Sequence, residues 1–237
     1  MKYQAVLFDL DGTLLPQDQD VFIQTYFGLL TKAMAKYGYD PQKLMKAVWA
    51  GTNDMVANDG ADTNEAVFWK RFAGIFGENA LKDVPLFDDF YRTAFQGVQA
   101  VCGVHPGVPA LIKDLKACGY RLALASNPVF PRVATEARMR WAGVSPDDFE
   151  VITTYENICF CKPNLRYYRC VAEKMHISPE KCLMVGNDVG DDMPARGIGM
   201  GVFLVTDCLI NHENVPVDQY PHGGINDLRH YLLSTEV

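Results

Sequence analysis

The 237-residue chain lacks several features that mark whole classes of protein. It has no continuous apolar run of the roughly 18 to 20 residues that a membrane-spanning helix needs, so we expect no membrane partner. Its first residues place Asp9 and Asp11 where a secretory signal peptide would have an apolar segment. It also has no Lys- or Arg-rich run, and its formal net charge of −7 disfavours nucleic acid as a partner. Internal repeats and low-complexity segments are absent as well.

Cysteine is present, but its pattern predicts neither disulfides nor a complete metal site. The seven cysteines are an odd number, and Cys182 lies inside the apolar stretch "CLMVG". This usage is typical of reduced thiols in a cytoplasmic protein, and the cytoplasm is the location we expect. Cys159 and Cys161 in "CFC" resemble half of a zinc site, but no second pair has a zinc-like spacing. A zinc protein built on these two residues is kept as an alternative.

Short apolar runs alternate with amphipathic stretches along most of the chain. The runs that we expect to be strands cover residues 3–10, 120–126, 150–154, 181–187 and 201–206. Most are apolar throughout, which is typical of strands that are covered on both faces. The expected helices between and after them cover residues 106–119, 131–143, 163–176 and 224–233. This alternation predicts an α/β fold with a doubly wound parallel sheet.

One long segment, residues 17–102, breaks the alternation because it contains no convincing buried strand. It has four helical patterns instead, at residues 21–38, 41–51, 63–77 and 86–99. We therefore expect an all-helical domain at 17–102, inserted into an α/β core made of 1–16 and 103–237. Residues 101–107 would be the return hinge. The polar stretch 51–60 is expected to be a loop that faces the site.

Polar side chains follow four of the predicted strands, at the point where each strand ends. Asp9 follows the first strand, Ser126 and Asn127 the second, Lys162 the third after one loop, and "NDVGDD" (187–192) the fourth. In open α/β sheets, ligands bind beyond the carboxyl ends of the strands. We therefore expect these four segments to form one site.

The stretch "AVLFDLDGTLL" (5–15) is the most informative of the four because an apolar strand ends in two acids. Side chains at i and i+2 of a strand share a face, so Asp9 and Asp11 would lie close together. Two charges about 4 Å apart in an effective dielectric of about 20 repel by about 4 kcal/mol. A nearby cation, or a proton on one acid, is needed to relieve this repulsion. Either a bound cation or a protonated acid indicates a catalytic or ligand-binding role for these two residues rather than a role in packing.

These motifs together resemble those of the haloacid dehalogenase-like hydrolase superfamily. "FDLDGTL" (8–14) resembles its motif I, DxDGT, and the other motifs follow in the expected order: "LALASN" (122–127), "CKP" with Tyr168 (161–168) and "MVGNDVGDDM" (184–193). The resemblance covers essentially the whole chain. It implies a Rossmann-like core, and the helical insert is similar to that family's C1 cap.

The resemblance implies a phosphatase and a role for each motif. Asp9 would attack a phosphate monoester and form an aspartyl-phosphate, and Asp11 would act as general acid and then as general base. Ser126, Asn127 and Lys162 would bind the phosphate. A lid of this size would exclude bulky partners, so a small phosphorylated metabolite is the expected substrate.

Counting charges at the expected site predicts a metal ion. Asp9, the acids of "NDVGDD" and a phosphate dianion would meet with Lys162 as the one evident cation, and Mg²⁺ would remove the conflict. The resemblance implies the Asp9 carboxylate, the Asp11 carbonyl and one acid of the last motif as ligands. That motif departs from the usual GDxxxD, because Asn187 follows the glycine.

Two registers of this last motif are possible, Asn187 with Asp191 or Asp188 with Asp192. We favour the second because it keeps two carboxylates at the i, i+4 spacing, with Asp188 as the metal ligand and Asn187 and Asp192 in support.

Several alternatives stay open at this point. A dehalogenase would lack the second acid, and a P-type ATPase would need membrane segments. A β-phosphoglucomutase-like transferase, or a non-catalytic metabolite-binding protein on the same fold, remains possible. Trp69, Lys70 and Arg71 are candidates for substrate contacts from the insert. The sequence does not indicate the substrate or the oligomeric state.

Overall fold

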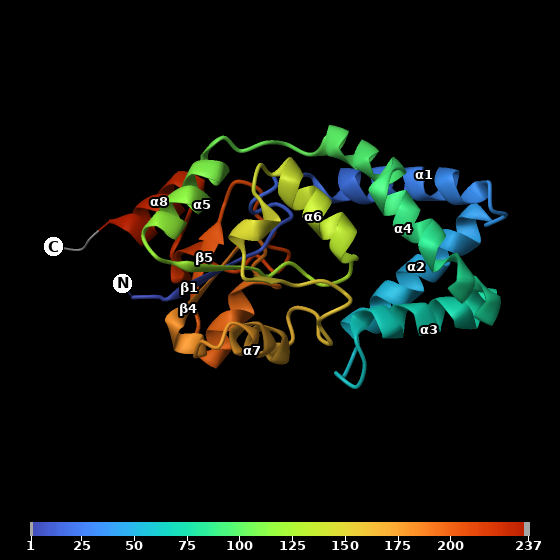
Figure 1. Ribbon diagram of the computed structural model, residues 1–237. Helices are drawn as coiled ribbons and strands as arrows, with labels where there is room; N and C mark the ends of the chain where they lie inside the picture. The colour runs from blue at the N-terminus through green and yellow to red at the C-terminus, as the bar shows by residue number, and fades with distance from the viewer. Residues whose placement is uncertain (1, 235–237) are drawn as a thin grey trace.

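A six-stranded sheet forms the centre of the computed structural model, which describes residues 2–234 (Figure 1). All neighbouring strands pair in parallel, in the order β3-β2-β1-β4-β5-β6. The strands are β1 Ala5–Phe8, β2 Arg121–Leu124, β3 Val151–Ile152, β4 Cys182–Gly186, β5 Gly201–Val205 and β6 His222–Gly223. The strand order reverses between β1 and β4, so the sheet is doubly wound, and the predicted fold class is confirmed.

Helices cover both faces of the sheet. In β1, Val6 and Phe8 belong to one buried cluster, while Ala5 and Leu7 belong to a second cluster on the other face. Figure 1 shows α5 and α8 on one side of the sheet and α7 on the other. The helices of this part are α5 Gly107–Ala117, α6 Arg132–Trp141, α7 Leu165–Lys174 and α8 Ile225–Leu233. Burial on both faces is the physical reason why the strands are apolar throughout.

The segment between β1 and α5 is helical, as expected. It contains α1 Gln19–Ala35, α2 Pro41–Val56, α3 Asn64–Phe76 and α4 Val84–Arg92, with 3₁₀ turns at Glu78–Asp83 and Ala94–Val101. These helices lie together at the end of the molecule opposite both chain termini (Figure 1), and we call them the cap. None of the described helices is both long enough and apolar enough to cross a bilayer.

The two chain segments that join the cap to the core lie side by side. The Gly103 N–H donates to the Pro16 carbonyl at 2.7 Å, and Gln17 and Cys102 form an isolated antiparallel bridge. The domain boundaries at 16/17 and 102/103 stay a prediction. The outermost residues that we assigned to the core, 1 and 235–237, lie outside the described part of the chain.

Three local predictions were wrong. Residues 51–56 are the last part of α2 rather than loop, because Val48, Gly51 and Met55 continue its buried face. The predicted helix 86–99 is broken at Thr93, where φ is −118° and ψ is −88°, and it continues as a 3₁₀ turn. The two-residue strand β6 was not predicted.

Candidate active site

The polar residues that follow the strands line one cavity of about 780 Å³ between the sheet and the cap. Asp9 comes from the end of β1, Ser126 and Asn127 from the end of β2, and Asp188 from the end of β4. Lys162 reaches the same cavity from the loop before α7. The structure thus brings together the residues for which the sequence predicted a common site. The cap supplies most of the opposite wall.

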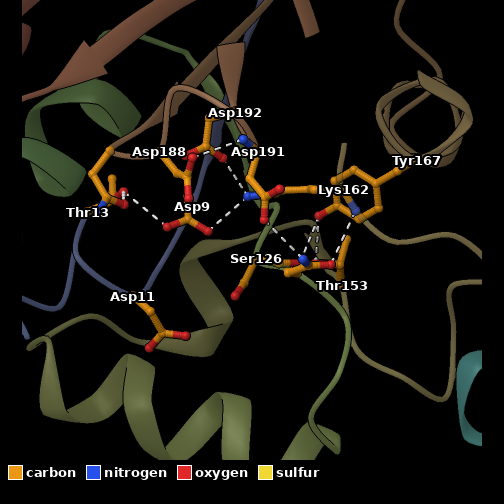
Figure 2. A network of polar contacts seen from close by, with 12 residues as sticks. Asp9, Asp11, Thr13, Ser126, Thr153, Lys162, Tyr167, Asp188, Asp191 and Asp192 are labelled. Carbon is orange, nitrogen blue, oxygen red and sulfur yellow. Dashed lines mark hydrogen bonds and ion pairs between the residues drawn. The ribbon is translucent and has the colours of Figure 1, made fainter. Parts of the chain in front are cut away.

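Asp9 sits at the centre of the polar network in Figure 2. Its Oδ1 accepts a hydrogen bond from Lys162 Nζ at 2.9 Å, and its Oδ2 accepts one from Thr13 Oγ1 at 3.1 Å. Its backbone N–H donates to the Val185 carbonyl at 2.9 Å, which fixes the residue to β4. The carboxyl group is therefore held at a position set by the sheet, with Lys162 and Thr13 as its partners.

Lys162 and Asp192 form a fully buried ion pair behind Asp9, with Nζ and Oδ1 2.6 Å apart. Burial alone would lower the pKa of Lys162, but the charges of Asp192 and Asp9 raise it well above its usual value. The pKa of Asp192 is raised to about 7. Burial is the largest cause and the charge of Asp9 adds to it, whereas Lys162 acts in the opposite direction. The Asp192 Oδ2 also accepts the Asp188 N–H at 3.0 Å. Asp192 therefore holds the lysine and the loop in place.

The loop after β4 uses its other polar side chains for local contacts. Asp188 Oδ1 accepts hydrogen bonds from the Gly190 and Asp191 N–H groups, at 2.7 and 3.1 Å. The Asn187 side chain accepts from Thr13 Oγ1 at 2.9 Å and donates to the Cys208 carbonyl at 2.7 Å. The Asn187 amide is therefore already used to join two loops. This favours the register in which Asp188 is the metal ligand and Asp192 supports it.

Asp11 lies apart from this network, and its side chain points toward α6 in Figure 2. Because β1 ends at Phe8, the expectation that Asp9 and Asp11 share the face of a strand was wrong. Asp11 instead forms an ion pair with Arg138 of α6 through its Oδ2, and its buried Oδ1 has no partner among the described residues. Burial raises the pKa of Asp11, although Arg138 acts in the opposite direction.

Each of the two acids of motif I therefore has its own cation, Lys162 for Asp9 and Arg138 for Asp11. Arg138 is 1% exposed, and its guanidinium lies 4.4 Å from the centre of the Phe130 ring. Arg138 was not among the residues predicted for the site from the sequence. The signal was an arginine on a helix face that is otherwise apolar, beside Ala134 and Trp141.

Ser126 and Asn127 are positioned by hydrogen bonds to neighbouring loops and to α7. The Ser126 carbonyl accepts hydrogen bonds from Thr153 Oγ1 at 2.7 Å and from the Tyr167 hydroxyl at 2.8 Å. The Asn127 side chain accepts the Lys162 N–H at 3.2 Å and donates to Asp191 Oδ2 at 3.2 Å. These contacts link the ends of β2 and β4 around the cavity.

Known proteins resemble this chain in sequence and fold. A sequence model described as haloacid dehalogenase-like hydrolase matches residues 3–199. The chain belongs to this family. A phosphoglycolate phosphatase from Cereibacter sphaeroides is 26% identical to this hydrolase over 223 residues, which cover 93% of this chain and 92% of the relative. A glyceraldehyde 3-phosphate phosphatase from Methanothermobacter thermautotrophicus is 28% identical over 147 residues, which cover 61% of this chain and 62% of that protein.

Solved structures show the same fold. The crystal structure of the HAD-hydrolase YfnB from Bacillus subtilis, which is bound to magnesium, has a TM-score of 0.57 and 19% identity to the hydrolase. The match covers 99% of this chain and 100% of that chain. Together with the phosphatases above, the family match supports assigning the chain to the hydrolases of phosphoric monoesters.

The donor set of the hydrolase fits a hard divalent cation. Five of the seven aspartates that line the cavity, Asp9, Asp11, Asp188, Asp191 and Asp192, come from the core. The charges of Asp188 and Asp9 contribute to the raised pKa of Asp191, whose largest cause is burial. Excess negative charge and oxygen donors suit Mg²⁺. Within residues 2–234, no group of three or more His, Cys, Asp or Glu side chains is arranged for a metal. The predicted ligand set needs only two carboxylates and a carbonyl, whereas the zinc alternative on Cys159 and Cys161 gains no support.

Only one of the three candidates from the cap reaches the cavity of the hydrolase. Trp69 lines it, but Lys70 and Arg71 are not part of its wall. The Arg71 guanidinium pairs with Asp54 on the surface, with Nε and Oδ2 2.7 Å apart. From the stretch 51–60, Thr52 and Val56 line the cavity, both within α2.

Proposed function

We propose that this protein is a Mg²⁺-dependent phosphatase that hydrolyses a small phosphorylated metabolite through an aspartyl-phosphate on Asp9. The observation that carries the proposal is the setting of the Asp9 carboxylate in the cavity wall, 2.9 Å from Lys162 Nζ. Lys162 is itself buried and held by Asp192, so its charge is fixed where a phosphoryl group would bind. Preorganised charge of this kind lowers the barrier to phosphoryl transfer.

In the first step, an Asp9 oxygen attacks phosphorus and the bond to the leaving oxygen breaks. Asp11 donates its proton to that oxygen, and the product alcohol leaves. In the second step, a water molecule attacks phosphorus, Asp11 takes its proton, and inorganic phosphate leaves as Asp9 is regenerated. Ser126 and Asn127 bind the phosphoryl oxygens, and Lys162 balances their charge.

Asp11 has the properties that this role needs. Its pKa is raised by burial, so a proton on its carboxyl group is accessible at a higher pH than for an ordinary aspartate. Its ion pair with Arg138 holds it toward α6 until a substrate is bound, so donation to a leaving group requires the side chain to leave Arg138. The unpartnered Oδ1 is the atom available for the proton.

A magnesium ion would be held by the Asp9 and Asp188 carboxylates and the Asp11 carbonyl. When bound, Mg²⁺ would neutralise charge on the phosphate and on the acids that surround it. Asp192 is engaged by Lys162 and the Asp188 N–H, so it acts as a support and not as a ligand.

Release of phosphate from p-nitrophenyl phosphate, with Mg²⁺ and with EDTA, tests the proposal. Asp9→Asn should abolish turnover, and EDTA should do the same to the unsubstituted protein. Asp18→Asn is the matched control, because Asp18 also lines the cavity but caps α1, and asparagine caps a helix equally well. Full activity in Asp9→Asn would contradict the proposal. Isomerisation of a sugar phosphate without phosphate release would indicate the mutase alternative.

A further inference from the structure

The cavity has two chemically different walls. The wall on the core side carries five aspartates and Lys162, whereas the wall on the cap side is mainly aromatic and aliphatic apart from the polar residues 17–20 around the start of α1. Phe22 and Tyr26 of α1, Trp49 of α2, Trp69 of α3 and Phe87 of α4 all contribute to it. With the phosphate bound beside Asp9, the rest of the substrate would lie against the aromatic side.

The lysine and arginine side chains near the cavity are already paired, which leaves neither for a second anionic group on the substrate; His212 is the one other basic residue of the lining. Among the described residues that line it, Lys162 is the sole lysine or arginine, and it already faces Asp9 and Asp192. Arg138 is buried behind the wall and paired with Asp11. A substrate carboxylate or second phosphate would instead meet further aspartates at the start of α1, Asp18 and Asp20.

The aromatic wall offers a sugar-like group few partners: Trp69 Nε1, a buried donor without a partner among the described residues, and the Thr52 hydroxyl are its main free polar groups. The hydroxyl groups of Tyr26 and Tyr91 lie 3.0 Å apart and bond to each other. Burial raises the pKa of Tyr26 to about 12, so the hydroxyl stays neutral. Placing a polyhydroxylated group there would leave its hydroxyls without adequate replacements for water, which is costly in an apolar site. A flat, apolar group would pack against the rings at no such cost.

We propose that the substrate is a phosphate monoester whose other end is uncharged, apolar and aromatic, held by the aromatic side of the cap. This inference rests on the proposed phosphatase function. It differs from what the name of the phosphoglycolate phosphatase relative suggests, because phosphoglycolate carries a second anionic group.

Three monoesters with primary-alcohol leaving groups separate the recognition of the leaving group from its reactivity: 3-phenylpropyl phosphate, glycerol 3-phosphate and 2-phosphoglycolate. We expect kcat/KM for 3-phenylpropyl phosphate to exceed both others by at least about tenfold, as burial of a phenyl ring would give. Equal values, or a preference for 2-phosphoglycolate, would overturn the inference.

A variant of the aromatic wall gives a second test. Trp49 is 44% exposed, so its replacement should not disrupt the core. Trp49→Ala should lower kcat/KM for 3-phenylpropyl phosphate by about tenfold, and clearly more than for glycerol 3-phosphate. Met45→Ala is the control, because Met45 is exposed on the same helix and outside the cavity wall. Equal losses for both substrates would contradict the inference.

Binding separates failure of this inference from failure of the proposed function. If no compound releases phosphate, including p-nitrophenyl phosphate, the phosphatase proposal fails. Calorimetric titration with 3-phenylpropylphosphonate and phosphonoacetate then still tests the cavity. Binding of the phenyl compound at least about tenfold more tightly supports the inference, and equal or reversed affinities refute it.

Discussion

Arg138 of α6 and Asp11 of the loop after β1 form an ion pair that joins the second acid of motif I to a helix more than a hundred residues away in the sequence. The two ends of the pair differ in exposure, because the side chain of Arg138 is 1% exposed and that of Asp11 is 28% exposed. A buried charge that loses its partner costs more free energy than an exposed one, since water can replace the partner of the exposed group.

This asymmetry predicts which substitution is worse for stability. Asp11→Asn should lower the free energy of unfolding by about 3 to 5 kcal/mol, because it leaves the Arg138 charge buried and unpaired. Arg138→Met should cost less, about 2 kcal/mol, because it leaves an acid that water reaches. Urea unfolding of both variants and of the double variant measures the effect.

The double variant should cost less than the sum of the single ones, by about 1 to 3 kcal/mol. Additive effects would show that the two side chains do not interact in solution, and a larger loss in Arg138→Met would reverse the predicted asymmetry.

Removal of the buried lysine should depend strongly on pH. Lys162→Met leaves Asp9 and Asp192 without their cation, and we expect a loss of about 3 to 5 kcal/mol at pH 8 in metal-free buffer. Lys162 lowers the pKa of Asp192, so its removal raises this pKa further above that of an unfolded aspartate, and the folded variant gains stability by taking up a proton as the pH falls. The loss should therefore be smaller at pH 5.

Lys116→Met serves as the control for this experiment, because Lys116 forms an exposed ion pair with Asp148. Lys116→Met should lower the free energy of unfolding by no more than about 1 kcal/mol at either pH. A loss in Lys162→Met that is equal at pH 5 and pH 8 would argue against the charge network.

The two possible registers of the loop after β4 make different predictions for magnesium. Asp188→Asn should raise the Mg²⁺ concentration for half-maximal activity by about 10- to 100-fold, because it removes a proposed ligand. Asp191→Asn should change it by less than about threefold, because Asp191 bonds to Asn127. Protection by Mg²⁺ against thermal unfolding gives a second measurement. The opposite ranking would support Asn187 and Asp191 as the functional pair.

The cysteines should react in an order set by burial. Burial raises the pKa of Cys182 to about 11 and that of Cys161 to about 12, whereas Cys118 is exposed. At pH 8 a thiol with a pKa of about 11 is roughly 0.1% thiolate, so it reacts slowly with iodoacetamide. Peptide mapping should find Cys118 modified first, and Cys161 and Cys182 modified only after addition of urea. Modification of Cys161 as fast as Cys118 would be inconsistent with its buried position.

The main features of the core could be predicted from the sequence because each depends on local pattern. Strands buried on both faces must be apolar along their length, and the polar residues that follow them meet because parallel strands end at one edge. For this reason Asp9, Ser126, Lys162 and Asp188 could be assigned to one site before the structure was known.

Other features depend on contacts that a local pattern does not contain. Arg138 is remote in sequence from Asp11, and an arginine on a helix usually faces solvent. The aromatic side of the cavity takes residues from four cap helices, each of which alone reads as an ordinary packing face. The break at Thr93 and the short strand β6 are likewise set by tertiary packing rather than by propensity.

Trapping the phosphorylated enzyme tests the central claim most directly. The protein is mixed with a ³²P-labelled monoester and Mg²⁺, quenched in acid and digested. We expect label on the peptide that contains Asp9, stable in acid and lost in hydroxylamine, as for an acyl phosphate, and absent from Asp9→Asn. Rapid hydrolysis of the substrate with no labelled peptide at any quench time, or label on a peptide without Asp9, would contradict the account.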